Sequence, residues 1–211
     1  MVTRWWWVRH GPVPSQKGFI YGQKDVPCDT SDLVAFEGLA STLPRDAVWV
    51  TSNLVRTHET LQAIWRQSGQ KGKVHSEPDF AEQSFGDWEG LAWKDFHAGK
   101  DPAYAKFWED PGNNRMPGGE SFADQIQRVR SAIERLTKKY EGSDIVAVTH
   151  SGTIRSAIAV ALGLDAAQAL KVSVDCLSIN RLDYLAGIKG NKEGGWRVSG
   201  INIPPYKVIG T

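Results

Sequence analysis

The chain has 211 residues, enough for one substantial domain but too few for two of ordinary size. Its 25 basic and 24 acidic residues nearly cancel, so no overall field draws it to a nucleic acid or to an acidic membrane surface. The 2 cysteines have no CxxC spacing, which disfavours a disulfide framework and a zinc ribbon and fits free thiols in a reducing cytoplasm.

The N-terminal half is predicted to alternate short strands with helices. Residues 1–8 lack the apolar run of a secretory signal, and the aromatic and β-branched run at 5–8 predicts a strand buried on both faces. Pro, Gly, Ser and Asp are frequent between residues 12 and 30, which is typical of a loop. Further along, we expect helices at 33–43 and 57–67, and short strands at 48–50 and 74–75.

The C-terminal half continues this alternation after an irregular segment. Residues 80–120 are rich in aromatic residues, Gly and Pro, and we expect a cap-like insertion with short helices there. Ser121 and Asp124 resemble a capping box that opens an amphipathic helix over 121–140. We then expect a buried strand at 145–148, a helix at 153–162, and late strands at 177–182 and 196–203. No apolar stretch is long enough to span a bilayer, so we expect a cytoplasmic location and no membrane partner.

Strands that alternate with helices predict an α/β sandwich around a mostly parallel central sheet flanked by helices. The sequence contains no internal repeat, low-complexity segment or linker that would divide it. We therefore predict a single domain over residues 1–211, in which residues 80–120 are the cap-like insertion.

Polar residues follow three of the predicted strands. Arg9 and His10 come after the first strand, Arg56 follows the polar turn after the second, and His150 ends the run at 145–148. Ligands of open α/β sheets bind beyond the carboxyl ends of the strands, so we expect these side chains to meet at one edge of the sheet. Arginine matches phosphate oxygens, helix N-termini attract anions, and a neutral histidine can attack phosphorus. Together these residues predict a phosphate site.

Each residue of this set also has a structural interpretation when it is taken alone. His10 can be a hydrogen-bonded turn residue, Arg56 a surface residue and His150 a helix cap. The two histidines with Glu82 could instead form a metal site, but the neighbouring guanidiniums would oppose a divalent cation. The sequence has no P-loop motif, dinucleotide motif or cysteine-phosphatase spacing. We therefore expect neither a metal nor a cofactor.

Five segments carry motifs in a definite order along the chain. They are Val8–Gly11 with Arg-His-Gly, Ser52–Thr57, Glu82–Gly90 with Gly-Asp-Trp-Glu-Gly, Pro117–Ser121 with Gly-Gly-Glu-Ser, and Val148–Arg155 with Thr-His-Ser-Gly. In this order they resemble the motifs of the histidine phosphatase superfamily, in the branch that includes cofactor-dependent phosphoglycerate mutases and α-ribazole phosphatases. The resemblance implies a phosphoglycerate mutase-like fold, a three-layer sandwich.

The resemblance also implies catalytic roles for five residues. His10 would be the nucleophile that becomes phosphohistidine. Glu82 would protonate the leaving oxygen and then activate water. Arg9, Arg56 and His150 would bind the phosphoryl oxygens and stabilise the charge of the transfer.

Further residues would contact the phosphate or the substrate. Gly11 would allow the backbone to approach the phosphate or the substrate closely. Gln16 occupies the position at which members of the superfamily have an asparagine that helps to bind phosphate. Tyr21 and Gly22 lie in the loop that would form part of the substrate pocket. Ser151 opens a helix whose backbone would add a donor to the phosphate.

Hydrolysis is the favoured reaction, because the chain lacks the lysine- and tyrosine-rich insert of dimeric phosphoglycerate mutases. Phosphoglycerate mutase-type transfer and a non-catalytic phospho-ligand binding protein are the alternatives. The expected partner is a small phosphorylated molecule, and an edge strand near the C-terminus could pair in a homodimer. Aromatic residues of the pocket segments predict either a partly apolar substrate or a small core within the cap. They are Phe19, Tyr21, Trp88, Trp93, Phe96, Tyr104, Phe107 and Trp108.

Overall fold

The computed structural model describes residues 1–96, 102–187 and 194–206. Within these residues the centre is a 6-stranded sheet in the order β3-β2-β4-β1-β5-β6. The strands are β1 (Val2–Arg9), β2 (Val48–Thr51), β3 (Val74–Ser76), β4 (Asp144–Thr149), β5 (Ile179–Leu185) and β6 (Gly195–Ile203). β1 to β4 run parallel, whereas β5 is antiparallel to both of its neighbours. The mostly parallel sheet that the sequence predicts is therefore mixed at one edge.

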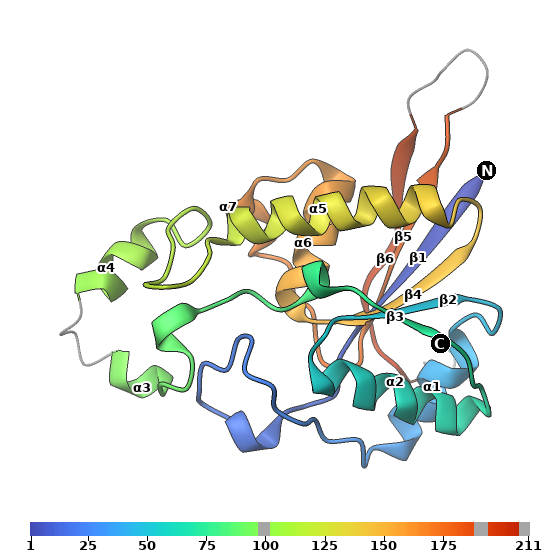
Figure 1. Cartoon of the computed structure of the whole chain (residues 1–211), viewed down its shortest axis with the longest axis horizontal. Helices are drawn as coiled ribbons and strands as arrows, with labels where there is room; N and C mark the ends of the chain where they lie inside the picture. Colours follow the sequence, from blue (N-terminus) through green and yellow to red (C-terminus); the bar gives the residue numbers. More distant parts are fainter. Residues whose placement is uncertain (97–101, 188–193, 207–211) are drawn as a thin grey trace, which may run out of the picture.

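Helices cover both faces of this sheet (Figure 1). α1 (Leu33–Thr42) and α2 (Val55–Ser68) pack on one face, where their apolar residues join those of β2 and β4. α5 (Phe122–Lys139) and α6 (Ser151–Leu162) pack on the other face, with the short α7 (Ala166–Ala169) beside α6. This three-layer arrangement confirms the predicted fold class. In the described part of the chain, no helix combines the length and the apolar character that crossing a membrane requires.

The segment between β3 and α5 lies beside the sheet (Figure 1). It contains two 3-10 turns, Pro78–Phe80 and Gly86–Trp88, and the helices α3 (Trp93–Phe96) and α4 (Pro102–Glu109). A small buried cluster consists of Ile20, Trp88, Phe107 and Met116. The described part of the segment thus has a core of its own. Residues 97–101 and the Phe96 side chain lie outside the described residues, so the cap over its full length stays a prediction.

β1 lies inside the sheet and is buried on both faces, as its aromatic run predicts. Trp5 and Trp7 are fully buried with the residues of α5, and their rings stack with 4.8 Å between the centroids. Trp6 packs on the opposite face, where its Nε1 donates a hydrogen bond to Asp144 at 2.9 Å and its ring contacts Arg181. The consecutive tryptophans therefore hold this strand between both helical layers.

The predicted element boundaries lie within about three residues of the observed ones, which is the usual uncertainty of boundaries predicted from sequence. The capping box of α5 is present, because Ser121 Oγ accepts from the Asp124 N–H and the Asp124 carboxylate accepts from the Ser121 N–H. Two short elements of the described chain were not predicted, the 3-10 turn Pro14–Gln16 and α7, because 3 and 4 residues are too few to show a helical period in the sequence.

Gly38 lies on α1 where the C-terminal segment crosses this helix. A side chain at this position would collide with the backbone carbonyl oxygen of the buried Pro205. The adjacent Tyr206 hydroxyl donates a hydrogen bond to Asp32 at 2.7 Å, and Asp32 also caps the start of α1. The segment therefore rests on α1 through a backbone contact that only glycine permits.

We expect Gly38→Ala to lower the free energy of unfolding by about 1 kcal/mol, because overpacking costs roughly 1–3 kcal/mol and helix propensity returns only about 1 kcal/mol. In a chain that ends at Ile203, the same substitution should instead raise the free energy of unfolding, because only helix propensity remains. Urea unfolding of the four proteins, followed by circular dichroism, measures both effects. Equal destabilisation in both backgrounds would contradict the contact with Pro205.

Candidate active site

The polar residues at the strand ends meet at one edge of the sheet. β1 and β2 both pair in parallel with β4, so the carboxyl ends of all three strands lie together. The His10 N–H donates to the carbonyl oxygen of Thr149 at 2.8 Å, and the His10 and His150 ring centroids are 5.2 Å apart. Nε of Arg56 lies 3.2 Å from Nδ1 of His150. The structure thus brings together residues from three separate motifs.

His10 is buried, with 1% of its surface exposed. Its Nδ1 lies 2.7 Å from the carbonyl oxygen of Gly11, which can only accept, so Nδ1 carries the proton and Nε2 has the lone pair. Burial first, and then the charges of Arg56 and Arg9, lower the pKa of His10 to about 3. The ring is therefore neutral near pH 7 and presents a nucleophilic nitrogen.

His150 is completely buried beside His10. Its Nδ1 accepts a hydrogen bond from Arg56, so its Nε2 carries the proton and donates to Ser52 Oγ at 2.7 Å. Burial and the Arg56 guanidinium hold the pKa of His150 well below its ordinary value. Both ring nitrogens have protein partners in this structure. A bond from His150 to a phosphoryl oxygen, as predicted, would have to replace one of them.

Arg56 is fully buried in the first turn of α2. Its Nη1 donates to the carbonyl oxygen of Lys24 at 2.8 Å, and its Nη2 donates to that of Gly22 at 2.6 Å. The Tyr21 ring packs against the guanidinium, with 5.1 Å between Cζ and the ring centroid. Together with the bond to His150, these contacts use three of the five guanidinium donors, and two remain for a ligand.

Glu89 fixes the loop that carries Tyr21 and Gly22. Its Oε1 accepts hydrogen bonds from the N–H of Gln23 at 3.0 Å and from the N–H of Phe85 at 3.1 Å. A Cβ on Gly22 would collide with this carboxylate, and Gly22 has a φ of 40°, so the position requires glycine. The Gly-Asp-Trp-Glu-Gly motif therefore supports the loop that orients Arg56.

Arg9 is half-buried next to His10. Its Nη1 donates to the carbonyl oxygen of Val174 at 2.6 Å, whereas its Nε is buried and has no hydrogen-bond partner among the described residues. A buried donor without a partner costs free energy, and an anionic ligand would remove that cost. Arg9 thus offers the cluster a second cation with unused donors.

Glu82 reaches the cluster from the segment after β3. Its Oε1 accepts from the N–H of Gln83 and from that of Gly152, each at 3.0 Å, and its Oε2 accepts from Ser151 Oγ at 3.2 Å. A Cβ on Gly152 would collide with the carboxylate. The Gly152 N–H at the start of α6 thus has Glu82 as its partner in this structure, because a helix N-terminus stabilises a nearby anion.

Arg128 of α5 holds the backbone that carries Glu82. Its Nη1 donates to the carbonyl oxygens of Asp79 at 2.6 Å and Ala81 at 3.0 Å, and its Nη2 donates to that of Glu82 at 3.0 Å. The guanidinium also bonds to both carboxylate oxygens of Glu120, at 3.0 and 2.7 Å. Sequence reasoning missed Arg128, because it stands on the long helix outside the five motifs.

The surroundings of three further residues could not be inferred from the motifs alone. The close backbone approach at Gly11 is to the chain itself, because a Cβ there would lie 2.6 Å from the carbonyl oxygen of Asp29. The Gln16 side chain makes no hydrogen bond to any described residue. Ser52, which the sequence placed in the Ser52–Thr57 motif without a role at the site, is buried against His150. Nowhere in the described ranges do three or more His, Cys, Asp or Glu side chains gather as a metal site.

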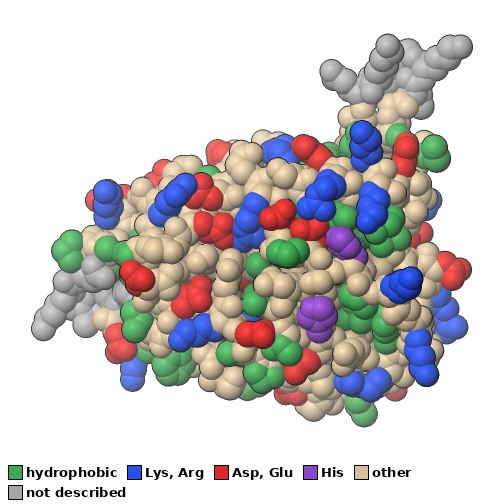
Figure 2. Space-filling view, in the orientation of Figure 1, with side chains coloured by type: hydrophobic (Ala, Val, Ile, Leu, Met, Phe, Trp, Pro, Cys, Tyr) green, Lys and Arg blue, Asp and Glu red, His purple; other side chains and the backbone are tan. Residues whose placement is uncertain are grey.

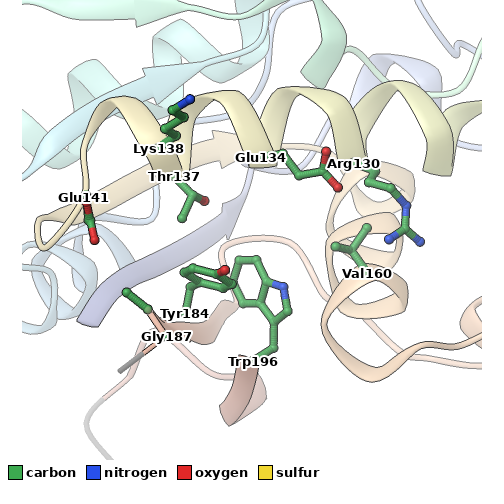
Figure 3. A pocket seen from close by; sticks show the side chains of 10 residues that line it. Arg130, Glu134, Thr137, Lys138, Glu141, Val160, Tyr184, Gly187 and Trp196 are labelled. Atoms are coloured by element: carbon green, nitrogen blue, oxygen red, sulfur yellow. The ribbon is translucent and has the colours of Figure 1, made fainter. Parts of the chain in front are cut away.

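On the face shown in Figure 2, basic, acidic and apolar side chains are interspersed. A hollow of about 620 Å³ lies between α5, α6, β5 and β6, where Tyr184 and Trp196 face Arg130 and Glu134 (Figure 3). None of the predicted site residues lines this hollow. The residues predicted to carry the chemistry therefore gather at the strand ends and not in this hollow.

Burial of two neutral histidines makes the stability depend on pH. The pKa of His10 is lower in the folded chain than its ordinary value of about 6.5, so below that pH the unfolded chain binds more protons. The free energy of unfolding should therefore fall as the pH decreases from about 7 to about 5, by roughly 2 kcal/mol for His10, and His150 should add to the fall in the same direction.

We expect His10→Asn to reduce this pH-dependent loss of stability by roughly 2 kcal/mol between about pH 7 and pH 5. Urea unfolding at the two pH values measures the difference. The same replacement at His58, which is partly exposed on α2, is the matched control for loss of an imidazole. An unchanged pH dependence in His10→Asn would show that His10 is not held neutral.

A family model described as the histidine phosphatase superfamily (branch 1) matches residues 5–202. The chain therefore belongs to this superfamily. The match covers all five motifs and both histidines of the cluster.

The chain is similar to several curated proteins, two of which are named as phosphatases. The metal-independent phosphoserine phosphatase of Arabidopsis thaliana is 30% identical over 155 residues, which are 71% of this chain and 64% of that protein. The adenosylcobalamin/alpha-ribazole phosphatase of Salmonella typhimurium is 28% identical over 202 residues, 92% of this chain and 98% of that protein. A bifunctional protein of Mycobacterium tuberculosis is 30% identical over 66% of this chain, and the match spans only 38% of its length.

The fold is also found in solved structures. The structure of the alpha-ribazole phosphatase from Shigella flexneri matches with a TM-score of 0.78 at 24% identity, over 99% of this chain and 100% of that chain. This likeness agrees with the α/β fold described above.

Proposed function

We propose that the protein hydrolyses a small phosphomonoester through a phosphohistidine intermediate on His10, with no metal ion or cofactor. The observation that supports this most is the state of His10, a buried neutral ring whose Nε2 has a lone pair beside two guanidiniums. Membership of the superfamily and the phosphatases among the relatives support hydrolysis as the reaction class.

In the first step, Nε2 of His10 attacks phosphorus and the bond from phosphorus to the ester oxygen breaks. Glu82 gives its proton to that oxygen, which leaves as an alcohol. Arg9 and the remaining donors of Arg56 bind the phosphoryl oxygens as their charge increases. In the second step, Glu82 takes a proton from water, the water oxygen attacks phosphorus, and the bond from phosphorus to Nε2 breaks.

The test is hydrolysis of p-nitrophenyl phosphate in the presence of EDTA. We expect turnover that the chelator does not change, with equal amounts of p-nitrophenol and inorganic phosphate released. Loss of activity in EDTA that added metal restores would overturn the metal-free mechanism. Less phosphate than p-nitrophenol when 3-phosphoglycerate is added would indicate transfer to an acceptor, as in a mutase.

A further inference from the structure

A second cavity adjoins the catalytic cluster on the side of Glu82. Its volume is about 140 Å³. It is lined by Phe19, Ile20, Tyr21, Gly22, Glu82, Phe85 and Trp93. Tyr21 and Glu82 connect it to the cluster, since the Tyr21 ring packs on Arg56 and the Glu82 carboxylate bonds to the start of α6. A group attached to the ester oxygen that Glu82 protonates would therefore enter this cavity.

Backbone contacts between two segments build the walls. The Ile20 N–H donates to the carbonyl oxygen of Leu91 at 2.9 Å, and the Trp93 N–H donates to that of Gly18 at 3.0 Å. Phe19 also forms a bridge to Ala92. The aromatic side chains thus stand on paired backbone, and the cavity is formed before a ligand binds. The aromatic residues predicted for this region are divided between two places. Phe19, Tyr21 and Trp93 line the cavity, whereas Trp88 and Phe107 are buried in the small cluster with Ile20 and Met116.

The cavity differs from the phosphate cluster in its chemistry. Phe19, Ile20, Phe85 and Trp93 give it apolar walls, and Glu82, which carries a proton when it acts as the general acid, is the only Asp, Glu, Lys, Arg or His among the described residues that line it. An apolar cavity of about 150 Å³ is large enough to bind benzene. A leaving-group carboxylate in the same space would meet no Lys, Arg or His among the described residues that line it, so its desolvation would have no compensation.

We propose that the substrate is a phosphomonoester whose leaving group carries a compact ring or similar apolar group and no carboxylate. This inference rests on the proposed phosphatase function, because it assigns the cavity as the binding site of the leaving group. It predicts that the protein prefers some phosphomonoesters over others according to the leaving group alone. Esters such as O-phosphoserine, which place a carboxylate close to the ester oxygen, should be poor substrates.

Three primary alkyl esters of similar leaving ability test the preference. Benzyl phosphate, ethyl phosphate and O-phosphoserine are compared by kcat/KM in EDTA, and by calorimetric binding to His10→Ala with inorganic phosphate as the reference. We expect benzyl phosphate to exceed ethyl phosphate by roughly tenfold or more in both measurements, because burial of a ring contributes at least that factor. O-phosphoserine should be no better than ethyl phosphate.

Variants of Phe19 connect this preference to the cavity. Its side chain is 43% exposed, so replacements should not disturb the fold. We expect Phe19→Ser to lower the ratio of kcat/KM for benzyl phosphate to that for ethyl phosphate several-fold, and Phe19→Lys to raise kcat/KM for O-phosphoserine. Leu91→Ser is the matched control, because Leu91 is 44% exposed on the paired segment but does not line the cavity.

The outcomes separate this inference from the proposed function. Hydrolysis of O-phosphoserine as fast as benzyl phosphate would overturn the inference and leave the phosphatase in place. The same loss in Phe19→Ser and Leu91→Ser would also overturn it. Tight binding of benzyl phosphate to His10→Ala, with no hydrolysis of any ester by the wild-type chain, would instead overturn the phosphatase function and retain the cavity as a ligand site.

Discussion

Replacement of His10 by alanine is expected to lower kcat for phosphomonoester hydrolysis by at least about a thousandfold, because the variant has no atom that can accept the phosphoryl group. The substitution removes a ring that makes one hydrogen bond to the carbonyl oxygen of Gly11, so the fold should persist. Steady-state kinetics and circular dichroism measure the two effects. His58→Ala, which removes a partly exposed histidine from α2, should keep most of the activity.

Detection of the covalent intermediate tests the role of His10 independently of the turnover rate. When the wild-type chain is mixed with ³²P-labelled substrate and quenched in alkali, we expect label on the protein that survives base and is lost in acid, as phosphohistidine requires. His10→Ala should carry no such label. An unlabelled wild-type protein that still turns over would assign the attack on phosphorus to water rather than to His10.

Replacement of Glu82 by glutamine is expected to slow the phosphorylation step by about a hundredfold for benzyl phosphate, and much less for p-nitrophenyl phosphate. The poor leaving group needs a proton as it departs, whereas p-nitrophenolate leaves without one. Glutamine keeps the oxygen that accepts from Gly152, so the start of α6 should stay in place. Rapid-mixing kinetics measures the phosphorylation rate for each ester.

The second step supplies a further signature of Glu82. If Glu82 also activates water, Glu82→Gln should release p-nitrophenol in a burst followed by slow turnover, because the phosphoenzyme accumulates. Equal slowing for good and poor leaving groups, without a burst, would remove Glu82 from both proton-transfer roles.

The strand ends could be predicted from sequence because their signals are local. An apolar run that stops at a polar residue marks both a buried strand and its end, as at Val8 before Arg9 and at Val148 before His150. Parallel strands share one carboxyl edge, so Arg9, His10, Arg56 and His150 follow as neighbours once the sheet is assumed. The capping box of α5 was predictable for the same reason, since its two partners are three residues apart.

What the tertiary structure alone decided are contacts between residues far apart in the chain. Arg128 and Glu82 are 46 positions apart, Ser52 and His150 are 98 apart, and neither pairing leaves a periodic or compositional trace. The tautomer of His10 depends on where one carbonyl oxygen lies, and its low pKa depends on burial and on two guanidiniums brought from different elements. The cavity beside Glu82 likewise exists only because two loops pair. Local patterns thus specified the elements and the residue types of the site, whereas long-range packing set their protonation, their orientation and the space left for a substrate.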